Sequence, residues 1–180
     1  MENEKYRFRR ACADDLGRIE EIVHAAQRRL RESGIDQWQN GYPNREVIER
    51  DMALGYGRVV CLAGRVVAYG ALTYDGESAY NDLQGEGWLT SDGEYLTIHR
   101  LCVADEVLGL GVGRLFFAFS EGEARARVAS VRVDTHPHNR IMQHLLTRLN
   151  YRYCGTVKYE SLRWAYEKLL HDEVGCQEAK

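Results

Sequence analysis

The chain has 180 residues, of which 44% are apolar and 28% are charged, and its formal net charge is −3. This length and composition predict one globular domain with a sizeable core and argue against two. Lys and Arg are scattered along the chain rather than gathered into a basic face, which excludes nucleic acid as a partner.

The five cysteines lie far apart, in or near apolar segments, and none belongs to a CxxC pair. This spacing suits a reducing cytosol and argues against a disulfide framework or a zinc site. The N-terminus MENEKYRFRR lacks the apolar segment of a signal peptide, and no apolar run approaches the roughly 18 residues that span a bilayer. We therefore expect a cytoplasmic protein with no membrane partner and no bound metal.

The first half of the chain predicts a strand, two helices and a pair of strands. KYRFRRA (5–11) is typical of a strand, and Asp14 follows as the N-cap of a helix that ends at Gly34. Tyr42-Pro43-Asn44 then starts a second, short helix. RVVCLA and VVAYGALTY predict two strands joined as a hairpin at Gly64-Arg65. The apolar stripe of the first helix is Leu16, Ile19, Ile22, Val23, Ala26 and Leu30.

Segment 75–94 is rich in Gly, Asp, Glu and Ser around Tyr80 and Trp88. Its length and composition predict a long functional loop within the domain rather than a domain boundary.

The second half predicts alternating strands and helices. YLTIHRLCV (95–103) and VASVRVDT (128–135) are typical of strands, and helices are expected over 112–127 and 137–149. Asn150 stands where a left-handed residue would end the later helix, and a closing hairpin is expected around residues 159–161. The apolar stripes of the two helices are Val112, Leu115, Phe116 and Phe119, and His138, Ile141, Met142, Leu145, Leu146 and Leu149.

This order of elements predicts an α+β fold in which a mixed central sheet is flanked by helices on both faces. In this interpretation residues 1–180 form one domain, with a structured core over about 5–170 and a flexible tail over 171–180.

Three glycines at alternate positions separate the strand 95–103 from the helix that follows it. Gly109, Gly111 and Gly113 belong to the stretch VADEVLGLGVGR. In such a turn several backbone N–H groups converge on the positive end of a helix, and no Cβ keeps a phosphate away. The turn therefore predicts an anion site, although three glycines also suit a tight turn that binds nothing. A dinucleotide GxGxxG motif is excluded because Gly113 comes one residue early, and no GK[ST] of a P-loop is present.

The stretch IHRLCVADEVLGLGVGRLF, followed by VRVDTHPHNRIMQHLLTRLNYRYCGTV, resembles the GCN5-related N-acetyltransferase (GNAT) family. In that family a strand ending in Leu-x-Val leads into a Gln/Arg-x-x-Gly-x-Gly/Ala turn and a helix. The resemblance extends over nearly the whole chain. It implies a single-domain GNAT-like fold, with acetyl-CoA (coenzyme A) as the acetyl donor.

The resemblance also implies which residues hold the cofactor. The glycine turn would bind the pyrophosphate, the backbone of the strand end would pair with the pantetheine arm, and Asn139 would reach the cofactor with its side chain. Two positions depart from the pattern: Leu108 replaces the family's Gln or Arg, and Leu146 stands where many members carry a tyrosine as general acid. The implied cofactor-binding set is Leu101, Cys102, Val103, Leu108, Gly109, Leu110, Gly111, Val112, Gly113, Arg114 and Asn139.

His99 is the candidate catalytic residue. An amine must be neutral to attack a thioester, yet a free alkylamine has a pKa near ~10, so the site needs a proton acceptor. His99 precedes the glycine turn, where some family members that acetylate arylalkylamines carry a catalytic histidine, and an unperturbed imidazole is mostly neutral in the cytosol. A non-catalytic core histidine and a water chain to a carboxylate such as Glu94 are the alternatives. Cys102 alternates to the opposite face from its neighbours, and we interpret it as a small buried hydrophobe.

Aromatic residues on segments that border the acceptor pocket in this family are the substrate-binding candidates: Trp38, Tyr42, Tyr74, Tyr80 and Trp88. Ordinary packing explains them equally well, because aromatic side chains are large hydrophobes first. The carboxylates of segment 75–94 either attract a cationic acceptor or form a solvated face; they are Asp75, Glu77, Asp82, Glu86, Asp92 and Glu94.

His136 and His138 flank Pro137 in a pattern that also occurs in metal sites. No carboxylate or cysteine has ligand spacing with them, so we expect helix capping and solvent contact instead.

Together these features predict an acetyl-CoA-dependent N-acetyltransferase, in which the primary amine of a small molecule attacks the thioester directly within a ternary complex. Two alternatives stay open. One is a protein N-terminal or lysine acetyltransferase, and the other is a non-catalytic acyl-CoA-binding or sensor module, which the missing tyrosine allows. The acceptor and the oligomeric state are not determined by the sequence, and a homodimer is compatible with it.

Overall fold

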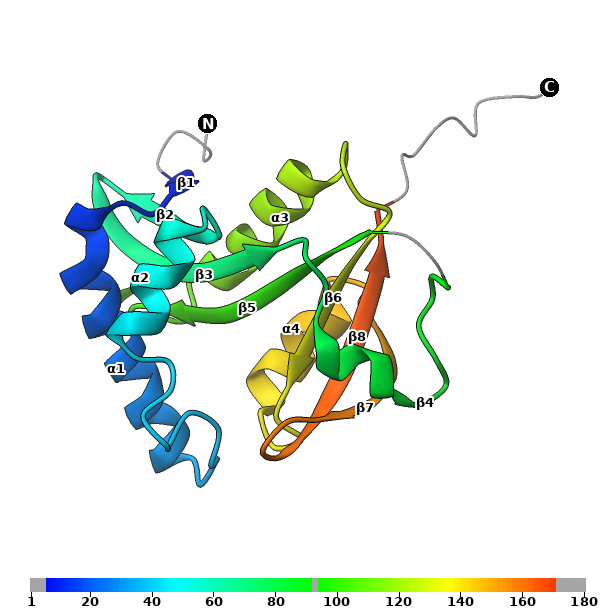
Figure 1. The fold of residues 1–180 in the computed structure, drawn as a ribbon. Coiled ribbons are helices and arrows are strands. Elements are labelled where there is room, and N and C mark those ends of the chain that lie inside the picture. The colour runs from blue at the N-terminus through cyan, green and yellow to red at the C-terminus, as the bar shows by residue number, and fades with distance from the viewer. Residues whose placement is uncertain (1–5, 92–93, 171–180) are drawn as a thin grey trace.

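An eight-stranded mixed sheet forms the centre of the protein (Figure 1). The computed structural model describes residues 6–91 and 94–170, so Asp92, Cys176 and the expected tail at 171–180 lie outside the described residues. The strand order is β1-β2-β3-β5-β6-β8-β7-β4, and of the described pairs only β5 and β6 run parallel. The strands are β1 (Tyr6–Arg10), β2 (Gly57–Leu62), β3 (Arg65–Thr73), β4 (Gln84–Gly85), β5 (Tyr95–Val103), β6 (Ser130–Thr135), β7 (Arg152–Lys158) and β8 (Leu162–Leu169).

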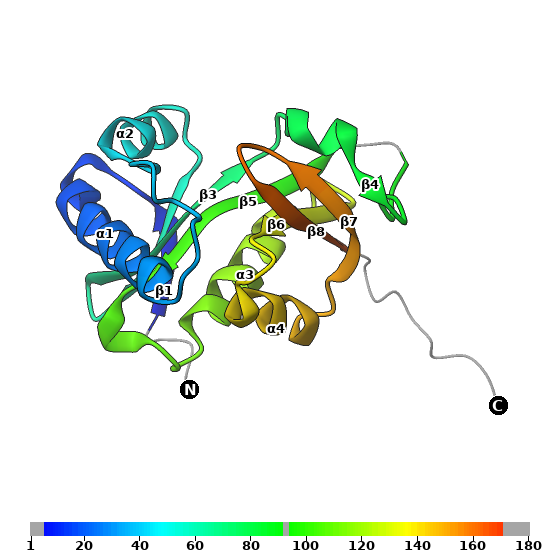
Figure 2. The ribbon, with the colours of Figure 1, turned by 90° about the horizontal axis from the view of Figure 1, so that it is seen from below.

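Helices cover both faces of the sheet, with α1 and α2 on one face and α3 and α4 on the other (Figure 2). This arrangement confirms the predicted α+β fold. The helices are α1 (Leu16–Glu32), α2 (Arg45–Ala53), α3 (Val112–Ala124) and α4 (Arg140–Arg148), and short 3₁₀ turns η1 (Ala13–Asp15), η2 (Ser78–Asp82) and η3 (Asp105–Val107) join the elements. None of the described helices has the length and apolar content that a bilayer span requires.

The apolar stripe of α1 packs inward as predicted, whereas those of α3 and α4 differ. Phe117 is fully buried beside Phe116, while Leu115 and Phe119 are only partly buried. The ring of Phe116 fills the space above Gly70 in β3, where a Cβ would lie 2.6 Å from the Phe116 ring. On α4, Ile141 is 85% exposed because it lies in the first turn and faces away from the sheet.

The start of α1 differs by one residue from the prediction. A 3₁₀ turn precedes the helix, so Asp15 rather than Asp14 becomes its N-cap. The Asp15 carboxylate accepts from the amide of Cys12 at 2.9 Å and pairs with Arg9 at 2.6 Å. The hydrogen bond from Arg9 is the main reason that the pKa of Asp15 falls to about 2. Asp14 is exposed.

Both expected hairpins are present, and Asn150 has the predicted left-handed conformation with φ of 64°. Segment 75–94 is more ordered than a loop, since it contains η2 and β4. β4 pairs with β7 through Gly85 and Gly155, where a Cβ on Gly155 would lie 2.3 Å from the Gln84 carbonyl oxygen. Glycine at this position allows the close approach of the two backbones.

The parallel strands β5 and β6 separate along their length, and this opening positions the site. Their described pairing covers Tyr95 to Thr97 of β5 opposite Ser130 to Arg132 of β6. Beyond Thr97 the remaining half of β5 is paired on its β3 side alone. The edge of β5 that faces the opening therefore keeps backbone groups available to a ligand.

Candidate active site

The glycine turn leads into a helix start with free backbone donors. Gly109 and Gly111 have φ of 76° and 80°, a conformation that costs other L-residues roughly 1–2 kcal/mol. Gly111 is the N-cap of α3 and has no side chain with which to cap the helix. The amides of Val112, Gly113 and Arg114 therefore have no partner one turn earlier and can bind an anion.

A groove of about 1620 Å³ extends from this turn along β5 to the start of α4. Leu110 is the member of the implied cofactor set that does not line it, since its side chain is 63% exposed. The other members line the groove: Leu101, Cys102, Val103, Leu108, Gly109, Gly111, Val112, Gly113, Arg114 and Asn139.

Two of these residues have their polar atoms committed to the fold. The Asn139 Oδ1 accepts from the amide of Met142 at 3.1 Å and caps α4, which leaves the amide nitrogen for a ligand. Cys102 is buried, and burial raises the pKa of its thiol to about 12, so it is no thiolate nucleophile. Leu146 is fully buried and places no hydroxyl in the groove.

The groove also contains arginines that sequence reasoning did not single out. Arg29 on α1 and Arg140 and Arg148 on α4 line it together with Arg114. These residues are far apart in sequence, and the fold brings them to one surface that suits phosphate groups. Arg29 also donates to the Val103 carbonyl oxygen at 2.9 Å, which ties α1 to the end of β5.

A second cavity, of about 600 Å³, lies beside the groove. Its walls are the connection between α1 and α2, the residues 98–100 of β5, Glu77, Asp134 on β6 and the turn between β7 and β8. Across its mouth, the Asn40 amide of the first wall donates to the Glu160 carboxylate of the last.

Five residues line both spaces and so mark where the groove and the cavity meet: Gln37, Trp38, Ile98, Arg100 and Asp134. A ligand in the groove and a ligand in the cavity would come into contact at this junction. Of the five, only Trp38 was a candidate from sequence, because the others come from separate elements that the fold assembles.

Arg100 at the junction has an unusual backbone conformation. Its φ is 57°, and the register of β3 with β5 shifts here as in a β-bulge. Asp51 on α2 accepts two hydrogen bonds from the Arg100 guanidinium, at 2.6 and 2.8 Å, and one from the Tyr69 hydroxyl at 2.6 Å. A further Arg100 N–H donates to the Tyr42 hydroxyl at 2.7 Å. This network stabilises the bulge beside the opening between β5 and β6.

His99 lines the cavity but is absent from the described lining of the groove. Its Nε2 lies 3.6 Å from a Glu77 carboxylate oxygen, and its side chain is 17% exposed. Burial, with the nearby Arg100 charge, lowers the pKa of His99 to about 3. The imidazole is therefore neutral at physiological pH and a much weaker base than an ordinary histidine.

Asp134 brings a carboxylate to the junction that sequence reasoning did not single out. The hydroxyls of Tyr80 and Tyr159 both donate to its Oδ2, at 2.9 and 3.2 Å. Burial is the largest influence on this carboxyl and raises the pKa of Asp134 above its usual value. Sequence reasoning had no signal for it, because one aspartate near the end of a strand resembles any other.

The five aromatic candidates lie in different places. Trp38 and Tyr42 line the cavity. Tyr80 is buried beneath it and packs against Trp88, whose indole N–H donates to the Tyr80 carbonyl oxygen. Tyr74 lies under the Arg127 guanidinium at 3.8 Å. Tyr74, Tyr80 and Trp88 do not belong to the described cavity wall, because β3 and η2 direct them elsewhere.

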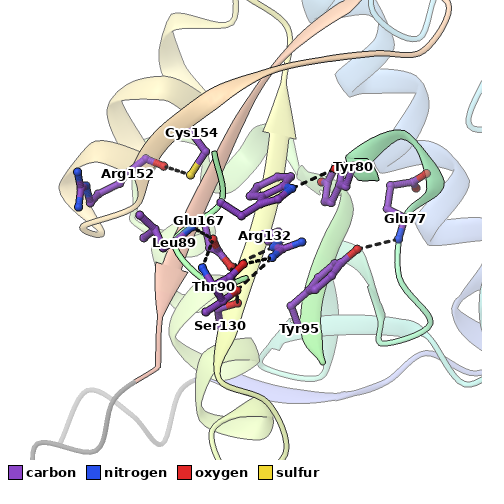
Figure 3. Close-up of polar contacts among 11 residues, drawn as sticks. Glu77, Tyr80, Leu89, Thr90, Tyr95, Ser130, Arg132, Arg152, Cys154 and Glu167 are labelled. Atoms are coloured by element: carbon purple, nitrogen blue, oxygen red, sulfur yellow. Dashed lines mark hydrogen bonds and ion pairs between the residues drawn. The ribbon is translucent and has the colours of Figure 1, made fainter. Parts of the chain in front are cut away.

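Segment 84–91 is attached to the sheet by a buried carboxylate (Figure 3). Glu167 on β8 accepts from the amides of Leu89 and Thr90 and from the Thr90 and Ser130 hydroxyls. Arg132 on β6 pairs with it at 3.0 Å. Of the acidic residues of segment 75–94 that are described, only Glu77 lines the cavity.

His136 and His138 form a capping contact. The His138 amide donates to Nδ1 of His136 at 3.1 Å, and the His136 Nε2 lies 2.9 Å from an Asp36 carboxylate oxygen. No group of three or more potential metal-binding side chains occurs among the residues that the structure describes.

Comparison with known proteins identifies the family. Residues 20–151 match the model of the acetyltransferase (GNAT) family. A GNAT-family acetyltransferase from Streptococcus agalactiae is 32% identical, and the two structures superpose with a TM-score of 0.85 over 91% of this chain and 95% of that one.

More distant structures share the fold. A GNAT-family acetyltransferase from Listeria monocytogenes is 21% identical, with a TM-score of 0.72 over 91% of this chain and 94% of that one. The ribosomal-protein-S18-alanine N-acetyltransferase of Escherichia coli is 12% identical, with a TM-score of 0.62 over 97% and 99% of the two chains. None of the curated proteins matches significantly. The family model and the 32% identical relative show that this chain belongs to the GNAT family of acetyltransferases.

Proposed function

We propose that this protein transfers an acetyl group from acetyl-CoA to the primary amine of a small molecule by direct attack within a ternary complex. The observation that carries the proposal is the junction of the two spaces at Gln37, Trp38 and Asp134. A thioester in the groove and an amine in the cavity would meet there without a covalent enzyme intermediate. The buried Cys102 thiol, with its raised pKa, also favours direct transfer.

The groove is the proposed site of acetyl-CoA, the donor that GNAT acetyltransferases use. The free amides at the start of α3 would hold the pyrophosphate, and Arg114, Arg140 and Arg148 would add charge complementarity. The unpaired edge of β5 would hydrogen-bond the pantetheine amides. Coenzyme A thereby supplies the activated acetyl group, and the protein supplies position and electrostatics.

The form of the cavity favours a small acceptor over a polypeptide. The Asn40–Glu160 hydrogen bond joins the two walls across which an extended peptide would have to enter. Asp36, Glu77, Asp134 and Glu160 line the cavity, and their charge favours a cationic amine. A protein N-terminus or lysine is the alternative, and its use would require that this bridge open.

We further propose that residues 1–180 act as one domain in the cytoplasm. The cysteines that the structure describes are free thiols, which suits a reducing compartment.

Release of free coenzyme A thiol tests the proposal. Purified protein and acetyl-CoA are mixed with a panel of small alkylamines, amino acids and short peptides, and acetylated products are identified by mass spectrometry. We expect amine-dependent thiol release with at least one small amine. Activity confined to peptides would favour the protein acetyltransferase, and calorimetric binding of acetyl-CoA without any turnover would favour the non-catalytic module.

A further inference from the structure

We propose that Asp134 accepts the proton of the acceptor ammonium group and that the side-chain oxygen of Gln37 holds the same nitrogen. This inference rests on the proposed function and assigns its proton acceptor. Neither residue belongs to the glycine turn or to the set implied by the family resemblance.

The first argument is position. Asp134 lies two residues beyond the last described pair of β5 with β6, where the strands have begun to separate. It lines both the groove and the cavity, as does Gln37 from the connection after α1. His99 lines the cavity alone. A group that receives a proton from the attacking nitrogen must lie within hydrogen-bond reach of it, and the junction meets this requirement.

The second argument is orientation. Both tyrosine hydroxyls donate to Oδ2 of Asp134, from η2 on one side and from the turn between β7 and β8 on the other. Among the described residues no side chain or backbone group donates to Oδ1. The carboxylate is therefore held in one orientation, with one oxygen left for a ligand.

The third argument is an orphaned acceptor. The Gln37 Oε1 atom is buried and has no hydrogen-bond partner within the described chain. A buried acceptor without a partner is destabilising, which indicates that a ligand satisfies it. An ammonium group has three donors, of which one can go to Asp134 Oδ1 and another to Gln37 Oε1.

The charges around Asp134 are consistent with this role. Burial raises its pKa, and the negative charge of Glu77 adds to this. The hydrogen bonds from Tyr80 and Tyr159 and the positive charge of Arg163 on β8 act in the opposite direction. Burial dominates, so Asp134 is a stronger base than an exposed aspartate, whereas the pKa of His99 falls to about 3.

The proposed reaction balances without a further reactant. The ammonium group loses one proton to the Asp134 carboxylate and becomes a neutral amine. Its nitrogen forms a bond to the thioester carbon, and the carbon–sulfur bond breaks. The second proton lost from nitrogen ends on the departing thiolate, which leaves as free thiol, and Asp134 returns its proton to solvent.

The test compares acceptors of different basicity in Asp134→Asn, with Asp82→Asn, an exposed aspartate of η2, as the matched control. For an alkylamine that the wild-type protein uses, we expect kcat to fall by about 10²–10⁴-fold. For a hydrazide or aromatic amine, which is already neutral, the loss should be less than about tenfold, because no proton has to be removed before attack. Calorimetric affinity for acetyl-CoA should not change.

Two further variants keep the inference falsifiable. Tyr159→Phe removes a hydrogen bond that stabilises the charged carboxylate, so the pKa of Asp134 should rise and the acidic limb of kcat/KM should move to higher pH. Gln37→Leu should raise the KM of the amine by roughly tenfold or more and leave the acetyl-CoA affinity unchanged.

Some outcomes would overturn the inference and leave the proposed function intact. These are an active wild-type protein with a fully active Asp134→Asn variant, an equal loss on both classes of amine, or a loss of 10²-fold or more on His99→Gln alone. Wild-type protein that acetylates no amine would instead refute the proposed function itself.

Discussion

Asp51 on α2 holds the guanidinium of Arg100 on β5 through two hydrogen bonds, at 2.6 and 2.8 Å, exactly where the strand adopts a positive φ. The contact links a helix on one face of the sheet to the bulge at the junction of the two cavities. It is a nearly buried ion pair, with side-chain exposures of 12% for Arg100 and 6% for Asp51.

Removal of one partner should therefore destabilise the protein strongly. Asp51→Ala leaves the Arg100 charge buried without an anion, and we expect a loss of about 3–5 kcal/mol in the free energy of unfolding. Chemical denaturation measures the loss, with Glu49→Ala on the exposed side of α2 as the control. A change below about 1 kcal/mol would show that the pair does not stabilise the bulge.

The glycine turn permits a matched test of the cofactor site. Gly111→Ala and Gly111→Asp both place a Cβ on a residue with φ of 80°, so they share the backbone strain. The aspartate adds a negative charge beside the proposed pyrophosphate. We expect acetyl-CoA to bind Gly111→Asp several-fold more weakly than Gly111→Ala, since like charges about 4 Å apart in water repel by about 1 kcal/mol. Equal calorimetric affinities for the two folded variants would contradict the assignment.

Local sequence features predicted the parts of the site that lie close together in the chain. The glycine spacing and the adjacent strand and helix patterns predicted the turn between β5 and α3, which the structure places along the groove. The N-cap of α1 shifted from Asp14 to Asp15 because Arg9 attracts the second aspartate, a contact between neighbouring elements that periodicity does not report.

The junction residues were unpredictable for a different reason. Gln37 and Asp134 are separated by almost one hundred residues and meet only because β5 and β6 separate beneath the connection after α1. Likewise, Trp88 resembled a pocket residue in sequence, whereas the Glu167 network attaches its segment to the sheet. Residue type suggested an aromatic wall, but side-chain direction decided which rings form it.

Trp38 and Trp88 should consequently differ in their effects. Trp38→Ala removes a wall at the junction and should raise the KM of the acceptor amine with little change in melting temperature. Trp88→Ala removes the ring that packs on Tyr80 and under the Arg132 guanidinium at 4.2 Å. We expect this variant to melt at a lower temperature. Steady-state kinetics and thermal melts on both variants check the separation, which equal effects on KM would contradict.

Glu167 should make stability depend on acid pH. Burial raises its pKa, but the hydrogen bonds from Ser130, Thr90 and Arg132 outweigh burial and lower it overall. Its stabilising contribution is therefore present above the unfolded-state pKa of about 4.3 and is lost as the pH falls through the lower folded value. Glu167→Gln should unfold more easily at pH 7 and lose less stability between pH 5 and 2, whereas exposed Glu86→Gln should match wild type. Parallel slopes for wild type and Glu167→Gln would contradict this assignment.

His99 provides the last prediction, because its two possible roles differ in pH dependence. Its pKa is lowered to about 3 by burial and by the Arg100 charge, so the folded state holds a neutral ring where the unfolded chain would protonate near ~6.5. The stability that this neutral ring contributes is complete above ~6.5 and is lost as the pH falls from there toward the folded value. His99→Gln should therefore melt with a flatter pH dependence than wild type between pH 6.5 and 4, while His24→Gln on the exposed side of α1 should not.

The same variant separates structure from catalysis. A ring that stays neutral down to low pH cannot produce an acidic limb near pH 6.5, so the kcat/KM profiles of wild type and His99→Gln should have limbs at the same pH. We expect kcat to fall by less than about tenfold, short of the 10²–10⁴-fold that a lost general base costs. A loss within that larger range, together with a displaced acidic limb, would return the proton acceptor to His99 and remove it from Asp134.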